Sequence, residues 1–211
     1  MKRLAIIGFG ALGRQLLSLL GERRDGLEVL RFDDTLYSSR AESCYPFDSY
    51  SDSSFADCQF YIGLGYKHLV RRAAVVTQLV GLGRDVPSWR HPSCHVHPGS
   101  LVGPGCVLYP LCNIGPDVTI QEGVLLNNSV IVSHGCRVGA GAYLSPGVVL
   151  SGDVSIGAST FVGSGVVISN GRTVGERARI GIGSVVTIDV PDDGSVIGNP
   201  ARLLPRPLNL D

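Results

Sequence analysis

Residues 95–190 read, when cut every six residues, HVHPGS LVGPGC VLYPLC NIGPDV TIQEGV LLNNSV IVSHGC RVGAGA YLSPGV VLSGDV SIGAST FVGSGV VISNGR TVGERA RIGIGS VVTIDV. The second residue of all sixteen hexads is Val, Ile or Leu, and the sixth is small or β-branched in every hexad except the one ending at Arg172. A period of six matches neither the 3.6-residue period of a helix nor the two-residue alternation of a strand. It predicts a short strand and a tight corner, repeated as a solenoid of hexapeptides.

Three such hexads make one triangular coil, so the sixteen hexads predict about five coils. The aliphatic second positions should stack along the inside, with successive rungs about 4.8 Å apart. Glycines at the third and fifth positions are expected to supply the positive φ that tight corners need. Because such a solenoid buries mostly itself, we also expect the chain to associate with copies of itself.

The chain ahead of the repeats alternates between strand and helix patterns. Residues 4–7, 29–32 and 60–65 are expected to be strands, and residues 14–20 and 67–80 are expected to be helices. Strand–helix alternation of this kind predicts a small parallel α/β sheet.

Composition and charge exclude several classes of protein. Eighteen basic residues balance eighteen acidic ones, so no basic excess is present to bind nucleic acid or an anionic membrane. No apolar run is long enough to cross a bilayer, and the opening run has no cleavage site typical of a signal peptide. The six cysteines contain no C-x-x-C pair. We therefore expect a cytoplasmic protein with free thiols, no membrane insertion and no nucleic-acid partner.

The glycine loop Gly8-x-Gly10-x-x-Gly13 follows a predicted strand and opens a predicted helix, which is the context of a phosphate-binding loop. About 88 residues before the coils are too few for a full dinucleotide domain, so NAD is not expected. Asp33 and Asp34, at the next strand end, are either a solvated turn or acceptors for a ribose or base.

Taken together, the glycine loop, the Asp33–Asp34 strand end, the coils and the tail at residues 197–202 resemble the hexapeptide-repeat acyltransferases. The similar subgroup has a left-handed parallel β-helix behind an N-terminal Rossmann-like domain. It contains sialic acid O-acetyltransferases and nucleotide-amino-sugar N-acetyltransferases. The resemblance implies a Rossmann-like nucleotide-sugar-binding domain at 1–88, an all-β left-handed β-helix at 89–190 and a C-terminal tail at 191–211. It also implies a homotrimer with sites between subunits.

His134 occupies the fourth position of its hexad, where a side chain faces outward at a corner. It is either a solvated corner residue or a general base, since an imidazole near neutral pKa can accept a proton. The family carries its catalytic histidine in the matching stretch, which favours the base. Relatives commonly carry Glu or Asp directly after it, whereas this chain has Gly135. Asn127, Asn128 or a residue of another subunit is then expected to take the role of that acid.

His95 and His97 lie two residues apart in the first hexad. They could be considered as metal ligands, but the three-histidine spacing of metal-dependent relatives is missing, so we expect a polar cap of the solenoid and no metal.

The resemblance also assigns ligand contacts. Relatives that bind UDP-sugars carry Ser-Gly-His in the glycine loop, and the matching residues here are Gly10, Ala11 and Leu12. Asp33, Asp34 and Gly65 would contact the nucleotide sugar. The coenzyme A groove would be lined by Tyr143, Ser164 and Ile182, with the N–H of Gly152 donating to the oxyanion.

The sequence therefore predicts an acetyl-CoA-dependent N-acetyltransferase acting on a nucleotide-linked amino sugar for bacterial surface glycans. The predicted mechanism is direct attack on the thioester, with His134 as general base and no metal. Two alternatives stay open: O-acetylation of a sugar of the sialic acid type, and a catalytically silent scaffold that binds a nucleotide sugar.

Overall fold

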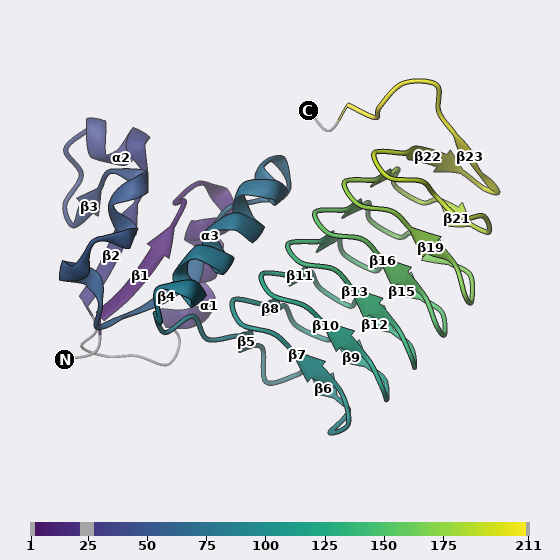
Figure 1. The fold of residues 1–211 in the computed structure, drawn as a ribbon, viewed down its shortest axis with the longest axis horizontal. Helices are drawn as coiled ribbons and strands as arrows, with labels where there is room; N and C mark the ends of the chain where they lie inside the picture. Colours follow the sequence, from purple (N-terminus) through teal and green to yellow (C-terminus); the bar gives the residue numbers. More distant parts are fainter. Residues whose placement is uncertain (1–2, 22–27, 210–211) are drawn as a thin grey trace. The chain divides into compact units, whose positions relative to one another are not determined.

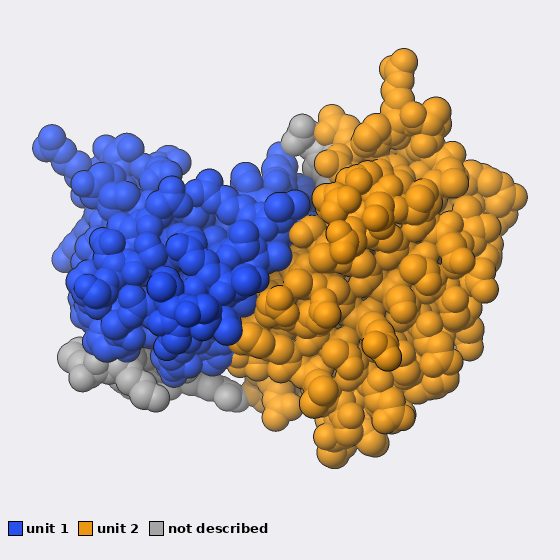
Figure 2. Space-filling model, in the orientation of Figure 1, with its two compact units in different colours: residues 1–87 blue, residues 88–211 orange. Residues whose placement is uncertain are grey.

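The computed structural model describes residues 3–21 and 28–209 (Figure 1). The chain divides into two compact units, Met1–Pro87 and Ser88–Asp211, which Figure 2 shows in blue and orange. Among the described residues, no helix has the length and hydropathy needed to span a membrane.

The first unit contains a four-stranded parallel sheet in the order β3-β2-β1-β4. Its strands are β1 (Arg3–Ile7), β2 (Glu28–Phe32), β3 (Cys44–Tyr45) and β4 (Cys58–Ile62), and its helices are α1 (Ala11–Gly21), α2 (Asp34–Ser38) and α3 (Leu69–Gly81), with 3-10 turns η1 (Phe47–Ser51), η2 (Ser53–Phe55) and η3 (Tyr66–His68). The parallel sheet expected ahead of the repeats is therefore present.

Two details differ from the sequence expectation. The strand expected at 60–65 is β4 and ends at Ile62, so Gly65 does not end a strand but precedes η3. The cause is Arg72, a buried residue of α3 that donates from Nη1 to the carbonyls of Ile62 at 2.8 Å and Leu64 at 2.9 Å. Those carbonyls bond to a side chain, and the chain turns away from the sheet.

The second difference is the segment between β2 and β4, where β3, α2, η1 and η2 have no periodic signal in the sequence. An aromatic cluster holds this segment. Phe55 meets the rings of Phe32 and Tyr45 edge to face at 5.0 and 4.9 Å, and Phe32 also lies against Phe60 at 6.5 Å. Because these contacts join distant parts of the chain, local pattern does not reveal them.

The second unit is a parallel β-solenoid. Each of the sixteen hexads contributes one two-residue strand at its first and second positions, and one further strand precedes them. These strands are β5 (Trp89–Arg90), β6 (His95–Val96), β7 (Leu101–Val102), β8 (Val107–Leu108), β9 (Asn113–Ile114), β10 (Thr119–Ile120), β11 (Leu125–Leu126), β12 (Ile131–Val132), β13 (Arg137–Val138), β14 (Tyr143–Leu144), β15 (Val149–Leu150), β16 (Ser155–Ile156), β17 (Phe161–Val162), β18 (Val167–Ile168), β19 (Thr173–Val174), β20 (Arg179–Ile180) and β21 (Val185–Val186).

Every third strand pairs in parallel, which gives three sheets. One sheet runs from β7 to β19, one from β6 to β21, and one from β5 to β20 and on to β22 (Ser195–Gly198) and β23 (Ala201–Leu203). The solenoid has about six turns, one more than the hexad count predicted. The extra strands lie at the ends of the solenoid. Because an end coil is covered by another coil on one side only, its second position can be a charged residue, as at the exposed Arg90.

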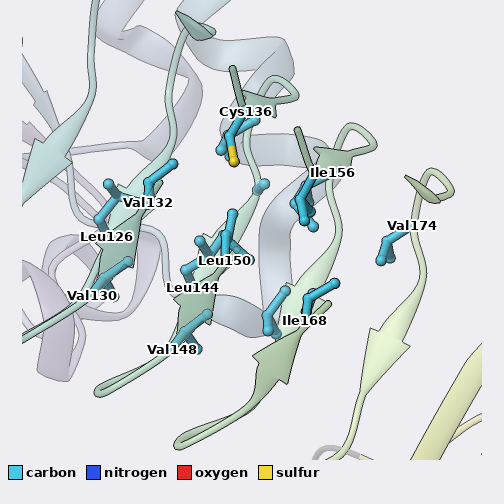
Figure 3. Packing of buried hydrophobic residues seen from close by; sticks show 14 of the residues in the cluster. Leu126, Val130, Val132, Cys136, Leu144, Val148, Leu150, Ile156, Ile168 and Val174 are labelled. Atoms are coloured by element: carbon cyan, nitrogen blue, oxygen red, sulfur yellow. The ribbon is translucent and has the colours of Figure 1, made fainter. Parts of the chain in front are cut away.

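The core of the solenoid is the stack of second and sixth positions, and its central part is shown in Figure 3. Leu126, Leu144 and Val162 occupy second positions of successive coils and are fully buried. Cys106, Cys112 and Cys136 occupy sixth positions and also face inward. The inward direction predicted for both positions is confirmed.

Glycines at the third and fifth positions of the hexads have different roles, whereas the sequence predicted that both would supply positive φ. Fifth positions have positive φ in every hexad except the first and the last, as at Gly135 with +67°. Asp, Ser, Leu or Arg also takes this conformation, as at Asp153 with +59°. Third-position glycines do not have positive φ. They are needed because a side chain would strike the next coil: a Cβ at Gly139 would lie 2.6 Å from the nitrogen of Ala158.

Candidate functional site

His134 lies at the corner between β12 and β13, and 58% of its side chain is exposed. The corner therefore presents the imidazole to solvent, as the fourth position of the hexad predicted. Within the described part of the chain, Asp153 is the only acidic residue within 4.0 Å of its ring nitrogens.

Asp153 reaches His134 from the next coil. Its backbone N–H donates to the carbonyl of His134 at 2.9 Å, and its carboxylate Oδ1 lies 3.9 Å from Nδ1 of the imidazole. Sequence reasoning missed this residue and suggested Asn127 or Asn128. Asn127 lies at a different corner, where its Nδ2 donates to the hydroxyl of Tyr143 at 3.1 Å. The overlooked signal is the spacing, since Asp153 follows His134 by one coil plus one residue.

Two glycines make room for this pair. The His134 ring lies against the backbone of Gly152, where an added Cβ would be 2.5 Å from Nε2. An added Cβ at Gly135 would overlap Oδ1 of Asp153 at 2.1 Å. Gly152 is buried, and no backbone acceptor for its N–H is found among the described residues. The corner thus combines an exposed imidazole, a carboxylate and a free backbone donor.

The glycine loop of the first unit uses its glycines in different ways. Gly8 has a φ of +80°, and its carbonyl lies 2.3 Å from the place of a Cβ on Gly13 and 2.1 Å from that of a Cβ on Gly63. These glycines let the loop, α1 and the end of β4 approach one another. Gly10 is exposed and a Cβ there would meet nothing within 4 Å. The space in front of the N-terminus of α1 is therefore open.

Ala11 and Leu12 form the first turn of α1, Ala11 exposed and Leu12 half-buried. Gly65 lies beyond β4 with open space where a Cβ would stand. Two cations that sequence reasoning passed over accompany the loop. The Arg31 guanidinium lies 5.1 Å from the centroid of the Phe9 ring, and Arg14 Nη1 donates to the Phe9 carbonyl at 3.4 Å.

Asp33 and Asp34 both bond to backbone. Asp33 Oδ1 caps α2 by accepting from the N–H groups of Thr35 and Leu36, and its Oδ2 accepts from the N–H of Phe9 at 2.9 Å. Asp34 Oδ1 accepts from the N–H of Phe47 at 2.8 Å. The Asp33 carboxylate thus fixes the glycine loop to the neighbouring strand end.

The residues predicted to line the coenzyme A groove lie elsewhere on the solenoid. Tyr143 is 8% exposed and stacks on Phe161 at 5.8 Å. Ser164 and Ile182 occupy one column at the corners that follow β17 and β20, where the Ser164 carbonyl accepts from Gly183 at 2.8 Å, and Ile182 is 70% exposed. This edge and the His134 edge lie on opposite sides of the sheet that runs from β6 to β21.

Among the described residues, the remaining histidines form no metal-binding cluster, and of the thiols Cys94 has its pKa lowered to about 7, chiefly by the neighbouring thiol of Cys112. His95 is exposed in the first full hexad, and His97 Nδ1 accepts from the N–H of Gly99 at 3.1 Å. No group of three or more potential metal ligands is found among residues 3–21 and 28–209. Cys136, closest in sequence to His134, faces the core, and burial raises the pKa of its thiol.

No protein-family profile matches the chain, and no curated protein sequence matches it. Solved structures of acetyltransferases do. The acetyltransferase domain of PglB from Neisseria gonorrhoeae is 28% identical, with 96% of this chain and 99% of that one covered and a TM-score of 0.80. A structure of the same domain in complex with acetyl coenzyme A is 27% identical, with 96% of this chain and 98% of that chain covered and a TM-score of 0.78.

A histidine-to-asparagine variant of perosamine N-acetyltransferase from Caulobacter crescentus, in complex with CoA and GDP-perosamine, is 25% identical, with 96% and 97% covered and a TM-score of 0.84. The similarity to these acetyltransferases therefore extends over both units of the chain.

Proposed function

We propose that this protein is an acetyl-CoA-dependent N-acetyltransferase whose acceptor is the amine of a nucleotide-linked sugar. The observation that carries the proposal is the likeness over nearly the whole chain to acetyltransferases crystallised with acetyl coenzyme A and with GDP-perosamine. A likeness to the solenoid alone would support acyl transfer but would not point to a nucleotide sugar. We also propose that the solenoid is left-handed, as in the family that the sequence resembles.

His134 is the general base of the proposed reaction. An amine must lose a proton as its nitrogen attacks the thioester carbonyl, and a neutral imidazole accepts that proton at physiological pH. The exposed ring has Nε2 near the backbone of Gly152, and Nδ1 on the side of Asp153. The free N–H of Gly152 is the donor for the oxyanion of the tetrahedral intermediate. The thiolate of CoA then leaves without an acyl-enzyme.

The first unit is proposed to bind the nucleotide as a reduced Rossmann-like domain. Its strand order, 3-2-1-4, is the order in which the first four strands of a Rossmann sheet lie. The open space at Gly10 and the N-terminus of α1 suit a diphosphate, and Arg14 and Arg31 supply positive charge nearby. Asp33 holds this loop in place, and Asp34, Gly65, Ala11 and Leu12 remain proposed contacts.

The coenzyme A groove is proposed to form between subunits of a homotrimer. Within one chain, Ser164 and Ile182 lie at a different edge of the solenoid from His134 and Gly152. If both assignments hold, the thioester bound along the Ser164 edge of one subunit can reach the base only where that edge faces the His134 edge of a neighbouring subunit. Tyr143, which is nearly buried, would then support this surface through Asn127 rather than contact the cofactor.

The test is release of free thiol from acetyl-CoA, with GDP-perosamine and UDP-linked amino sugars as acceptors. We expect acceptor-dependent thiol release and an acetylated product that survives hydroxylamine, because an amide resists this reagent and an ester does not. A hydroxylamine-labile product formed on sialic acid would indicate O-acetylation. Binding of a nucleotide sugar with no thiol release would indicate the silent scaffold. Either result would overturn the proposal.

A further inference from the structure

We propose that Asp153 is the residue that positions and polarises His134, and that Gly135 is glycine so that the Asp153 carboxylate can occupy this place. The assignment rests on the proposed role of His134 as base. It adds a second residue to that base, from a different coil, and gives a reason for the missing side chain at position 135.

The geometry begins with the corner column. The coils stack Asp117, Gly135, Asp153 and Gly171 at the fifth positions of successive corners. Acidic residues thus alternate with glycine, and each carboxylate has the space of a missing side chain beside it. The carboxylate of Asp153 uses the space at Gly135, because its Oδ1 lies 2.1 Å from where a Cβ would stand.

The charged surroundings of His134 are simple. On the following coil its neighbour is Asp153, on the preceding coil the same corner carries Pro116 and Asp117, and on its own coil Arg137 begins β13. Cys136 points into the core, where its thiol donates to the carbonyl of Ser151 at 3.0 Å. Among the described residues, only the Asp153 carboxylate comes within 4.0 Å of the ring.

This arrangement has a chemical consequence. A carboxylate on the Nδ1 side favours the tautomer with the proton on Nδ1. The lone pair of Nε2 is then available to take the proton from the sugar amine. It also stabilises the imidazolium formed during proton transfer. At 3.9 Å the groups are just beyond hydrogen-bond distance, and such pairs commonly shorten when the substrate is bound. Since both side chains are largely exposed, we expect a moderate effect that salt weakens.

The direct test is an NMR titration of the full-length protein, in which the His134 resonance is identified by its loss in His134→Ala. Asp153→Asn replaces one exposed oxygen by nitrogen and should not disturb folding. We expect its His134 titration midpoint to fall below that of the wild-type protein, because the neutral amide no longer favours the imidazolium. The acid limb of the rate profile should move the same way, with a plateau turnover lower by roughly tenfold.

Gly135→Ala and Gly171→Ala form the matched pair. Both positions have the same positive φ, +67° and +66°, in one corner column, but a Cβ at Gly171 meets nothing within 4 Å. Both variants carry the same backbone strain, and only Gly135→Ala displaces the carboxylate. We expect Gly135→Ala to lower the midpoint and Gly171→Ala to leave it at the wild-type value. Gly135→Asp combined with Asp153→Gly should raise the midpoint again, since the second change clears the space and Asp117 already adopts this conformation.

An unchanged midpoint in Asp153→Asn, or equal midpoints in the two glycine variants, overturns the assignment. The titration needs no substrate, so it separates this inference from the proposed function. If the wild-type protein shows no turnover but Asp153→Asn still lowers the His134 midpoint, only the proposed function is contradicted. Full turnover with an unchanged midpoint in Asp153→Asn contradicts the role of Asp153 alone.

Discussion

At the scale of single residues, the glycines of the Gly8–Gly13 loop and of Gly63 meet different structural requirements. Gly8 supplies a positive φ, Gly13 and Gly63 allow backbones to touch, and Gly10 leaves open space. In a nucleotide-binding loop, one glycine allows the tight turn, another allows close packing of helix and strand, and a third leaves room for the ligand. The glycines here have the same three roles. The motif in the sequence shows only that glycine is present, and the structure shows which glycine is needed for which purpose.

This division predicts opposite outcomes for two substitutions. Gly63→Ala should destabilise the protein by about 2 kcal/mol or more, because its Cβ would overlap the Gly8 carbonyl. Gly10→Ala should leave stability within about 0.5 kcal/mol and weaken binding of GDP-perosamine. Urea unfolding and calorimetric titration measure the two effects. Equal stability of the two variants would contradict the assigned roles.

At the scale of elements, the solenoid follows from one rule in the sequence. A buried residue every six positions fixes the strands, their spacing and their inward side, so the sixteen predicted strands lie where the hexads place them. The segment between β2 and β4 was not predictable, because aromatic contacts between distant residues hold it. The partner of His134 was missed for a similar reason. Asp153 is a neighbour of His134 in space because the two residues lie one coil apart, and the local hexad pattern does not show this contact.

The same rule predicts where a coil is vulnerable. Leu144→Ala removes a fully buried second-position side chain from a central coil and should cost about 2–5 kcal/mol of unfolding free energy. Leu101→Ala removes a first-position side chain that is 68% exposed and should cost less than about 0.5 kcal/mol. Denaturant titration of both variants gives the comparison. A loss at Leu101 as large as that at Leu144 would mean that this outward face is covered in solution.

At the scale of the whole molecule, the proposed site is divided between two edges of the solenoid. His134 and Gly152 lie at one edge, and Ser164 and Ile182 lie at another. If the proposed assignments hold, a second copy is needed to bring the base and the thioester together. Oligomerisation would then be part of the proposed mechanism and not only a means to bury apolar surface.

Mixed oligomers test this division. We expect light scattering to give three chain masses, and His134→Ala and Ser164→Trp to be inactive when purified separately. If sites lie between subunits, randomly mixed trimers should recover about a quarter of wild-type turnover, because that share of interfaces contains both intact edges. No recovery in demonstrably mixed oligomers would place the whole site within one chain.

The central claim is that His134 removes the proton from the amine as acetyl-CoA is attacked. The measurement that tests it is kcat for acetyl transfer by His134→Ala, with Asn170→Ala as the control from the same corner column two coils on. We predict that His134→Ala lowers kcat by roughly 10²–10⁴, leaves nucleotide-sugar affinity and folding unchanged, and that Asn170→Ala keeps wild-type turnover. Retention of more than about half of wild-type kcat by His134→Ala would contradict the account.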